Sequence, residues 1–273
     1  TMTGGDGNDS LSALLAASAK ASGIVYGGPG ASMATAYVYT AFATVYGNDI
    51  FMLAGAGNDT LSLMLTADAR AFVSGVNLSG SVSYLTGYDA SAYVTDNSIV
   101  MTGGSGSDNL TAHLAASARI TALALAKNYS YAYAIADYAS ASVWDNDIFM
   151  SGGSGSDTLS VMLSADALVY ASASGGASSV TALAYYAYAS VNSNNITMTG
   201  GSGSDNLTAM LAATARATAT AIGRTFATNV YASGYTAYAS VYNNNIIMAA
   251  GSGNDTLALM LTGKFNRFAV FSG

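Results

Sequence analysis

Six copies of one motif rich in glycine and aspartate divide this chain of 273 residues into units of nearly equal length. The first two copies read GGDGND and AGAGND, the next three all read GGSGSD, and the last reads AGSGND. The aspartates that close them lie 48 to 50 residues apart, at Asp9, Asp59, Asp108, Asp157, Asp205 and Asp255. A period of this length is typical of solenoids, propellers and arrays, whose units stack because none of them can bury a core alone. We therefore expect one continuous stack.

Alternating apolar and polar residues follow each closing aspartate, and the second residue of this stretch is always leucine. These leucines are Leu11, Leu61, Leu110, Leu159, Leu207 and Leu257. A period of two with a constant apolar parity predicts a strand with one buried face. A second strand leads to an asparagine in five of the units, at Asn48, Asn97, Asn146, Asn194 and Asn244. A short third strand, which carries isoleucine and methionine, leads into the next glycine motif.

Each unit is thus predicted to contain three strands and three corners. The fold class that we expect is all-β: a right-handed parallel β-solenoid, similar to a β-helix or β-roll, of about 5.5 large coils with three strands per coil. The many inner alanines predict a flat coil, because small side chains let facing sheets approach closely. The third corner is expected around 22–32, 74–82, 126–130, 172–179 and 219–230. An antiparallel meander of the same segments is the alternative.

The domain organisation that follows is a single repeat domain, 1–273. Its repeats span approximately 1–49, 50–98, 99–147, 148–195 and 196–245, with a partial repeat at 246–273. Residues 263–273 depart from the pattern and are expected to form a C-terminal cap or a joint to another subunit.

Composition excludes several functional classes. Only 8% of the residues are charged and the net charge is −7, so the chain has no basic footprint for nucleic acid or an anionic membrane. No apolar run is long enough for membrane insertion as a helix, and the chain contains no cysteine. It also lacks glutamate, and its one histidine, His113, has no fixed partner in the repeat pattern. We therefore expect no enzymatic activity and no catalytic residues.

The segment GGSGSDTLS, residues 152–160, resembles the nonapeptide GGxGxDxUx of the repeats-in-toxin (RTX) family, in which U is a large apolar residue. The copies that begin at Gly4, Gly103 and Gly200 fit this pattern fully. The resemblance implies that the first six residues form a turn that binds Ca²⁺, within a parallel β-roll. Two features depart from the family. The nonapeptide occurs once per repeat here rather than in tandem, and Ala54 and Ala250 replace the first glycine, which should weaken those two loops if the position requires a positive φ.

The resemblance implies that the six closing aspartates are calcium ligands, together with residues of the turns before them. The turn residues are Gly4, Asp6, Gly7, Gly57, Gly103, Ser105, Gly106, Gly152, Ser154, Gly155, Gly200, Ser202, Gly203 and Gly253. Each carboxylate would share an ion with backbone carbonyls of its own loop and of the next loop. Independently, Ca²⁺ prefers six to eight oxygen ligands, and glycine turns can direct carbonyls inward. The alternative is a tight turn in which aspartate caps its own backbone.

Two further columns follow from aligning the repeats. Lys20, Arg70, Arg119 and Arg216 share one position and are expected on a solvated outer face. The asparagines at the second corner are expected to form a hydrogen-bonded ladder.

These features together predict an extracellular or cell-surface, calcium-binding structural protein that self-assembles into filaments, a biofilm matrix or a surface layer. Its partners would be copies of itself, joined head to tail, with lateral packing as a further option. About 5.5 coils spaced at ~4.8 Å would give an axial rise near 26 Å. The alternative is a repeat or stalk module of a secreted adhesin, or an accessory domain of a secreted enzyme.

Overall fold

The structure is a computed structural model that describes residues 1–28, 33–77, 82–127, 131–176, 179–223 and 229–272. Within these residues the regular elements are all β-strands, and every strand pairing between them is parallel. The antiparallel alternative is therefore wrong, and the prediction of a parallel β-solenoid with three strands per coil is confirmed.

The strands form three sheets, which we name by the length of their strands. The long sheet contains β2 (Ser10–Gly27), β5 (Thr60–Asn77), β8 (Asn109–Ala126), β11 (Thr158–Gly175), β14 (Asn206–Gly223) and β17 (Thr256–Ser272). The middle sheet contains β3 (Met33–Tyr46), β6 (Val82–Thr95), β9 (Tyr131–Trp144), β12 (Ser179–Asn192) and β15 (Asn229–Tyr242). The short sheet contains β1 (Met2–Thr3), β4 (Asp49–Ala56), β7 (Ser98–Ser105), β10 (Asp147–Ser154), β13 (Asn195–Ser202) and β16 (Asn245–Ser252).

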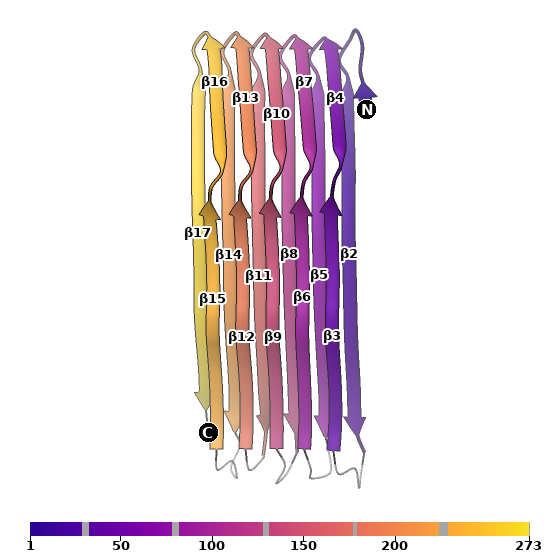
Figure 1. Cartoon of the computed structure of the whole chain (residues 1–273), viewed down its shortest axis with the longest axis vertical. Coiled ribbons are helices and arrows are strands. Elements are labelled where there is room, and N and C mark those ends of the chain that lie inside the picture. Colours follow the sequence, from indigo (N-terminus) through magenta and orange to yellow (C-terminus); the bar gives the residue numbers. More distant parts are fainter. Residues whose placement is uncertain (29–32, 78–81, 128–130, 177–178, 224–228, 273) are drawn as a thin grey trace.

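The strands run along the longest axis of the molecule (Figure 1). In each coil the short strand continues beyond the end of the middle strand along the same axis, and the long strand returns behind both (Figure 1). The register places equivalent residues of the repeats side by side, so that Leu11 pairs with Leu61, Leu61 with Leu110, and so on to Leu257. The predicted columns of the first strand are therefore confirmed.

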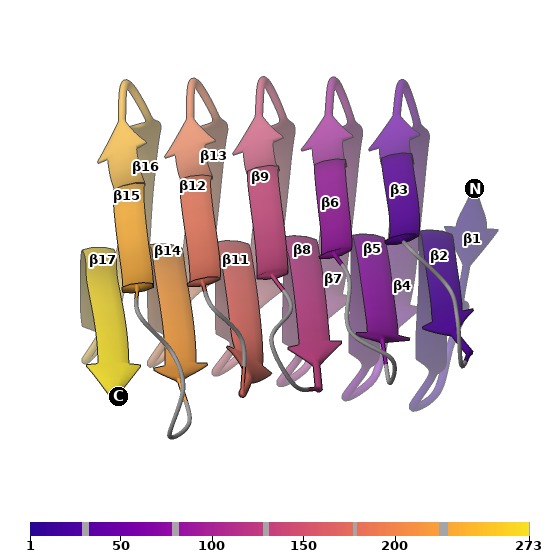
Figure 2. The same cartoon turned by 90° about the horizontal axis from the view of Figure 1, so that it is seen from below.

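The interior is thin where it is lined by alanine. Cα atoms of the long and middle sheets approach within 8 Å along the strands, because residues such as Ala69, Ala90 and Ala92 are fully buried between them. Few Cα atoms of the long and short sheets come so close, since Leu61 and Met52 fill a wider space there. Each middle strand lies over the interval between two long strands (Figure 2), as β3 contacts both β2 and β5.

The alternation of inner and outer residues reverses once in each middle strand. In β6, Gly87 and Ala90 are buried, whereas the two residues between them, Tyr88 and Asp89, are more exposed and both lie on the outer face. The ladder pairing skips the column to which Tyr88 belongs. An unbroken period of two would place this column inside the coil. The local bulge gives the outer face two adjacent polar or aromatic positions per coil.

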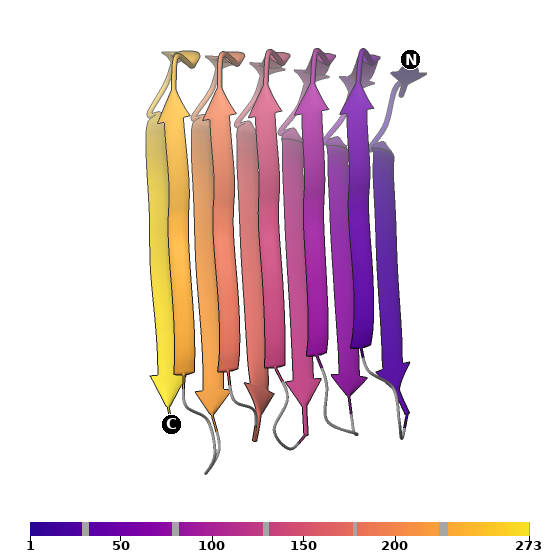
Figure 3. The same ribbon diagram turned by 60° about the horizontal axis from the view of Figure 1, so that its bottom comes forward.

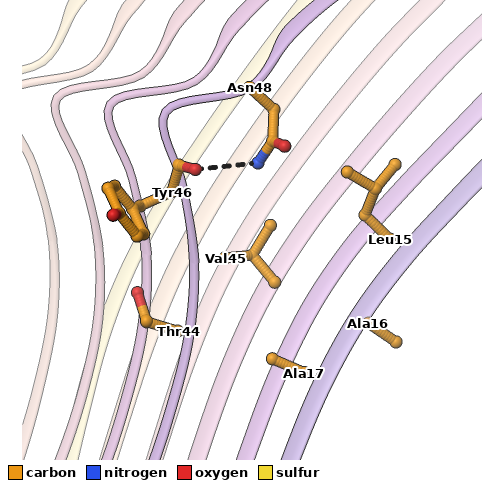
Figure 4. Close-up of a pocket in the computed structure, with 7 residues that line it drawn as sticks. All are labelled: Leu15, Ala16, Ala17, Thr44, Val45, Tyr46 and Asn48. Carbon is orange, nitrogen blue, oxygen red and sulfur yellow. Dashed lines mark hydrogen bonds between the residues drawn. The ribbon is translucent and has the colours of Figure 1, made fainter.

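The asparagine corner forms the predicted ladder. Nδ2 of Asn97 donates to Oδ1 of Asn146 at 2.8 Å, and Asn146 donates to Asn194 at 2.9 Å. These three side chains are at most 1% exposed. Figure 4 shows the first member, Asn48, at the edge of the stack, where its Nδ2 donates to the Tyr46 carbonyl at 3.1 Å. The ladder satisfies buried amides that would otherwise destabilise the corner.

The third corner begins later than the sequence predicted. Segments that we expected in this corner, such as 22–27 and 74–77, continue the long strands because their alternation persists with more varied side chains. The remaining positions, 29–32, 78–81, 128–130, 177–178 and 224–228, lie outside the described residues. At the other end, 263–272 belongs to β17, so most of the expected cap or joint is a sixth strand of the long sheet.

No helix occurs in the ranges that the structure describes, and so none of those residues forms a helix able to cross a membrane.

Candidate calcium-binding corner

The closing aspartates form a column in which side chains cross-link successive coils. From Asp59 onward, Oδ1 of each aspartate accepts a hydrogen bond from the backbone N–H of the aspartate in the preceding coil, at N···O distances of 2.6–2.9 Å. The four aspartates inside the stack, Asp59, Asp108, Asp157 and Asp205, are only 1–2% exposed. Half of each carboxylate is therefore committed to holding the coils together.

The second oxygen of these carboxylates has no such role. Oδ2 of Asp59, Asp108, Asp157 and Asp205 is buried without a hydrogen-bond partner. Among the described residues the ion pair that forms joins Asp68 to Arg70, on the outer face of β5, so no basic side chain neutralises the column. A buried carboxylate without a partner is strongly unfavourable, and in proteins such groups are usually paired with cations or protonated.

The pKa values of the column agree with the burial of unpaired carboxylates. Burial raises the pKa of Asp108 and of Asp157 above the ordinary aspartate value. The hydrogen bond that each accepts from a backbone N–H lowers the pKa in part, while the charge of Asp59 raises the pKa of Asp108, and the charges of Asp108 and Asp205 raise that of Asp157. The column thus favours binding either protons or cations.

The first glycine of the motif makes room for the carboxylate. A Cβ built on Gly103 would overlap Oδ2 of Asp108 and lie 2.7 Å from the carbonyl oxygen of Gly152 in the next coil. This glycine does not have a positive φ, in contrast to the second and fourth residues of the motif in that copy, Gly104 and Gly106. The position therefore does not require the positive φ on which the expected weakening of the Ala54 and Ala250 loops depended, and the alanines instead place a methyl group beside the carboxylate.

The fourth glycine of the motif is fixed by the neighbouring coil. A Cβ on Gly155 would overlap the carbonyl oxygen of Gly106, and Gly57 stands in the same relation to Gly7. Gly7 itself, in the first coil, has nothing within 4 Å of an added Cβ. From the second copy of the motif onward, the backbones at this fourth position are therefore stacked too closely to admit a side chain.

The third-position side chains are not brought to the carboxylates. Asp6, Ser105, Ser154 and Ser202 are exposed on the solvent side of the turn. The backbone carbonyl at this position accepts a hydrogen bond from the fourth glycine of the preceding coil, as Ser154 O does from Gly106 N at 2.7 Å. Any calcium contact from these residues would use backbone oxygen.

The sequence reasoning missed a second ladder at the fifth position of the motif. Oδ1 of Asn8 accepts from the N–H of Asn58 at 2.8 Å, and Oδ1 of Asn58 accepts from the N–H of Ser107 at 2.8 Å. Ser107 and Ser156 continue the ladder through their hydroxyls. The signal was available, because this position is always asparagine or serine.

These residues fit a hard cation such as Ca²⁺. The corner supplies a buried, unpaired carboxylate oxygen in four consecutive coils, with backbone carbonyls of the adjacent coil beside it. In the described part of the chain, no three histidine or acidic side chains converge on one point. The remaining ligands would therefore be backbone carbonyls and water.

Comparison with known proteins supports the same assignment. Residues 1–14, which contain the first glycine–aspartate corner, match the family model described as RTX calcium-binding nonapeptide repeat (4 copies). The match supports a calcium-binding repeat module of the kind found in secreted proteins. Searches of curated proteins and of solved structures gave no significant match.

Proposed function

We propose that this chain is an extracellular, non-catalytic structural protein in which calcium ions occupy the aspartate corners of a β-solenoid, and that its copies join end to end into filaments of a matrix or surface layer. The observation that carries the proposal is the column of four buried carboxylate oxygens without partners. Bound Ca²⁺ would supply the positive charge that this column lacks, and its binding would stabilise the folded state.

The ends of the stack support assembly with further copies. At one edge β17 exposes Leu257, Leu259 and Leu261, which are 50–56% exposed and belong to columns that are buried in the four inner coils. Edge strands with unpaired backbone groups readily pair with another chain. In β17 the inner column of buried Ala217 is continued by Arg267, so a joint at this edge would have to accommodate one charged side chain in that column.

The hydrogen-bond ladder at the aspartate corner is complementary between its two ends. Oδ1 of Asp9 lacks the N–H donor that every following aspartate in the column has. At the other end, the N–H of Asp255 lacks the carboxylate acceptor that Asp205 N–H finds in Asp255. A second copy placed head to tail would satisfy both groups, and such a heterologous contact produces open filaments.

The strand count predicts the filament geometry. Because the long and short sheets contain six strands each, the shortest translation that avoids overlap is six strand spacings. At ~4.8 Å per spacing, copies of this chain joined in this way would have an axial rise of about 29 Å, compared with the ~26 Å expected from the sequence. The middle sheet has five strands, so each joint would leave room in it for one further strand.

Electron microscopy in millimolar calcium and after chelation tests the proposal, with Gly7→Ala as the decisive variant. In the free chain an added methyl at Gly7 meets nothing within 4 Å, but in a head-to-tail joint it would overlap the carbonyl of Gly253 in the adjoining copy, by analogy with Gly57 and Gly7. We expect the variant to fold and to bind calcium but to form no end-to-end filaments, which are recognised by their axial repeat of about 29 Å. Gly47→Ala is the control for a methyl added at a positive-φ glycine: its φ is 66°, compared with 113° for Gly7, and its column holds residues with side chains in the other coils.

Each outcome is informative. Wild-type filaments that disappear on chelation, together with filaments of Gly47→Ala but not of Gly7→Ala, would support the proposal. Monodisperse wild-type particles in calcium would contradict the filament role and favour a repeat module of a secreted adhesin. Calcium titration by calorimetry would then still decide the metal assignment separately.

A further inference from the structure

The outer face of the middle sheet is a broad aromatic surface, which we call the aromatic face. Tyrosine rings of neighbouring coils stack along it, with centroids 5.1 Å apart for Tyr39 and Tyr88 and 4.7 Å apart for Tyr185 and Tyr235. Many of these rings are exposed; Tyr39, for example, is 66% exposed. An exposed aromatic surface of this extent usually marks an interaction site.

The charges on the aromatic face are all negative. Asp89 and Asp137 lie on adjacent strands near its centre, and the described middle strands contain no lysine or arginine. Burial raises the pKa of Asp137, and the nearby Asp89 raises it further. The centre of the face therefore lacks a cation.

The outer face of the long sheet carries the opposite charge. Its described strands present five basic residues, Lys20, Arg70, Arg119, Arg216 and Lys264, against two acidic residues, Asp68 and Asp166, which gives a net charge of +3. The first four basic residues form the predicted column and are exposed, so their placement on a solvated face is confirmed. Arg119 has no acidic partner in its own chain among the described contacts.

The two charged regions lie at the same height on opposite sides of the coil. The column of Gly234, next to the bulge, packs on the backbone of Ala217 and Phe268 in the long sheet. Ala217 follows Arg216 in the chain, and Tyr235 follows Gly234. The arginine column is therefore directly behind the tyrosine and aspartate positions of the bulge. A copy displaced perpendicular to the sheets would place its arginines against these positions.

We infer that copies of this chain also stack face to face, with the arginine column of one long sheet against the aromatic face of the next copy. This inference deepens the proposed structural role and rests on it. Arg70 and Arg119 would meet Asp89 and Asp137, which belong to the same coils, and Arg216 would lie over tyrosine rings in a cation–π contact.

The shape and size of the faces favour this arrangement. The sheets are nearly untwisted (Figure 3), and flat sheets of many strands are usually stabilised by stacking on other sheets. Five strands of 14 residues present a face of roughly 46 by 24 Å. Covering it would bury about 2,200 Å² over both partners, which exceeds the ~1,600 Å² of a standard interface. Because the two faces differ, the stack would continue without closing.

Charge reversal on each face separately tests the inference. The first variant carries Arg70→Glu and Arg119→Glu, and the second carries Asp89→Lys and Asp137→Lys. The experiment uses the full chain in calcium in the Gly7→Ala background, so that face-to-face stacking is measured without end-to-end growth. Sedimentation velocity and electron microscopy report the stacks, and circular dichroism with a calcium-dependent melt reports folding.

We expect the Gly7→Ala parent to form stacks with a repeat of roughly 20 Å, two sheet spacings. Each reversal variant alone should remain unstacked, because its two faces carry like charges, whereas an equimolar mixture of the two should stack again. A control that reverses Asp96 and Asp145 to lysine changes the net charge equally but lies at the asparagine corner, and it should stack like the parent.

Three results would overturn the inference. The parent could remain unstacked at all concentrations, the reversal variants could stack as the parent does, or the folded mixture could fail to stack. Retention of an unstacked parent on insoluble polysaccharide would likewise overturn it and assign the aromatic face to a glycan. If the wild type formed no end-to-end filaments, the proposed function would be contradicted, but the face-to-face stacking of the Gly7→Ala chain could still be measured and interpreted.

Discussion

Replacing Asp157 by asparagine should change the sign of its effect on stability between chelator and calcium. The side-chain amide of the variant would be able to keep the Oδ1 acceptor for Asp108 N–H, which is 2.8 Å away in the wild type, while removing the charge of the buried Oδ2. In chelator the substitution relieves repulsion within the column. In calcium it removes a ligand.

The magnitude follows from the stacking. Two unit charges at the ~4.8 Å coil spacing repel by about 0.9 kcal/mol at the dielectric constant of water and about 3.5 kcal/mol at an effective value of 20. Asp157 has a carboxylate neighbour in both adjacent coils, Asp108 and Asp205, whereas Asp255 has one. In chelator we therefore expect Asp157→Asn to stabilise the fold by at least about 2 kcal/mol, and by at least twice as much as Asp255→Asn, which has one carboxylate neighbour and is less buried.

In calcium Asp157→Asn should instead destabilise the fold relative to wild type. An ion present at 100 times its dissociation constant stabilises the folded state by about 2.7 kcal/mol, and the variant loses this contribution at one corner. The assay is thermal and urea unfolding of wild type, Asp157→Asn and Asp255→Asn, each in millimolar calcium and after complete chelation. Destabilisation by Asp157→Asn in chelator, or an effect of the same sign in both conditions, would refute the reasoning.

Three further predictions concern the same corners. Gly7→Ala should destabilise the monomer by about 1–3 kcal/mol, the strain of its positive φ. Gly155→Ala should cost about 3 kcal/mol more, because it carries the same strain and its methyl also overlaps a backbone carbonyl; equal urea midpoints would contradict this. Asn146→Ala should cost about 3 kcal/mol, since it leaves buried groups of two adjacent coils without partners, and a midpoint within error of wild type would count against the ladder. In calcium-free buffer the melting temperature should fall as the pH rises from 4 to 7. The pKa values of Asp108 and Asp157 are raised above 3.8 in the folded state, so the stability that their protonated forms contribute is complete at low pH and is lost as the two groups ionise. A melting temperature that rises with pH would contradict this prediction.

Much of the architecture could be predicted from the sequence because stacking repeats every constraint. The leucine column at Leu11 and its equivalents, the asparagine ladder and the glycine–aspartate corner each recur in register, and a recurring position must satisfy the same environment in every coil. The structure confirms these features for the same reason.

What the sequence did not reveal depends on backbone detail within one coil. The bulge at Tyr88 and Asp89 places two consecutive residues on the outer face, so the inner and outer positions exchange parity from there on. A prediction that assumes an unbroken period of two cannot locate such an exchange. The tyrosine at an apparently inner position was the available sign. The role of Gly103 likewise depends on contact with Asp108 rather than on its own φ, which no propensity argument contains.

The arrangement of the three sheets also determines how the protein would respond to force. Tension along the strands, the longest axis of the molecule, is carried by the covalent backbone of every coil (Figure 1). Tension along the stack is resisted by hydrogen bonds alone, but strands of 18, 14 and 8 residues in each coil must separate together. A material built from such coils would be anisotropic: nearly inextensible along the strands, and along the stack brittle, because one coil interface has to fail as a whole.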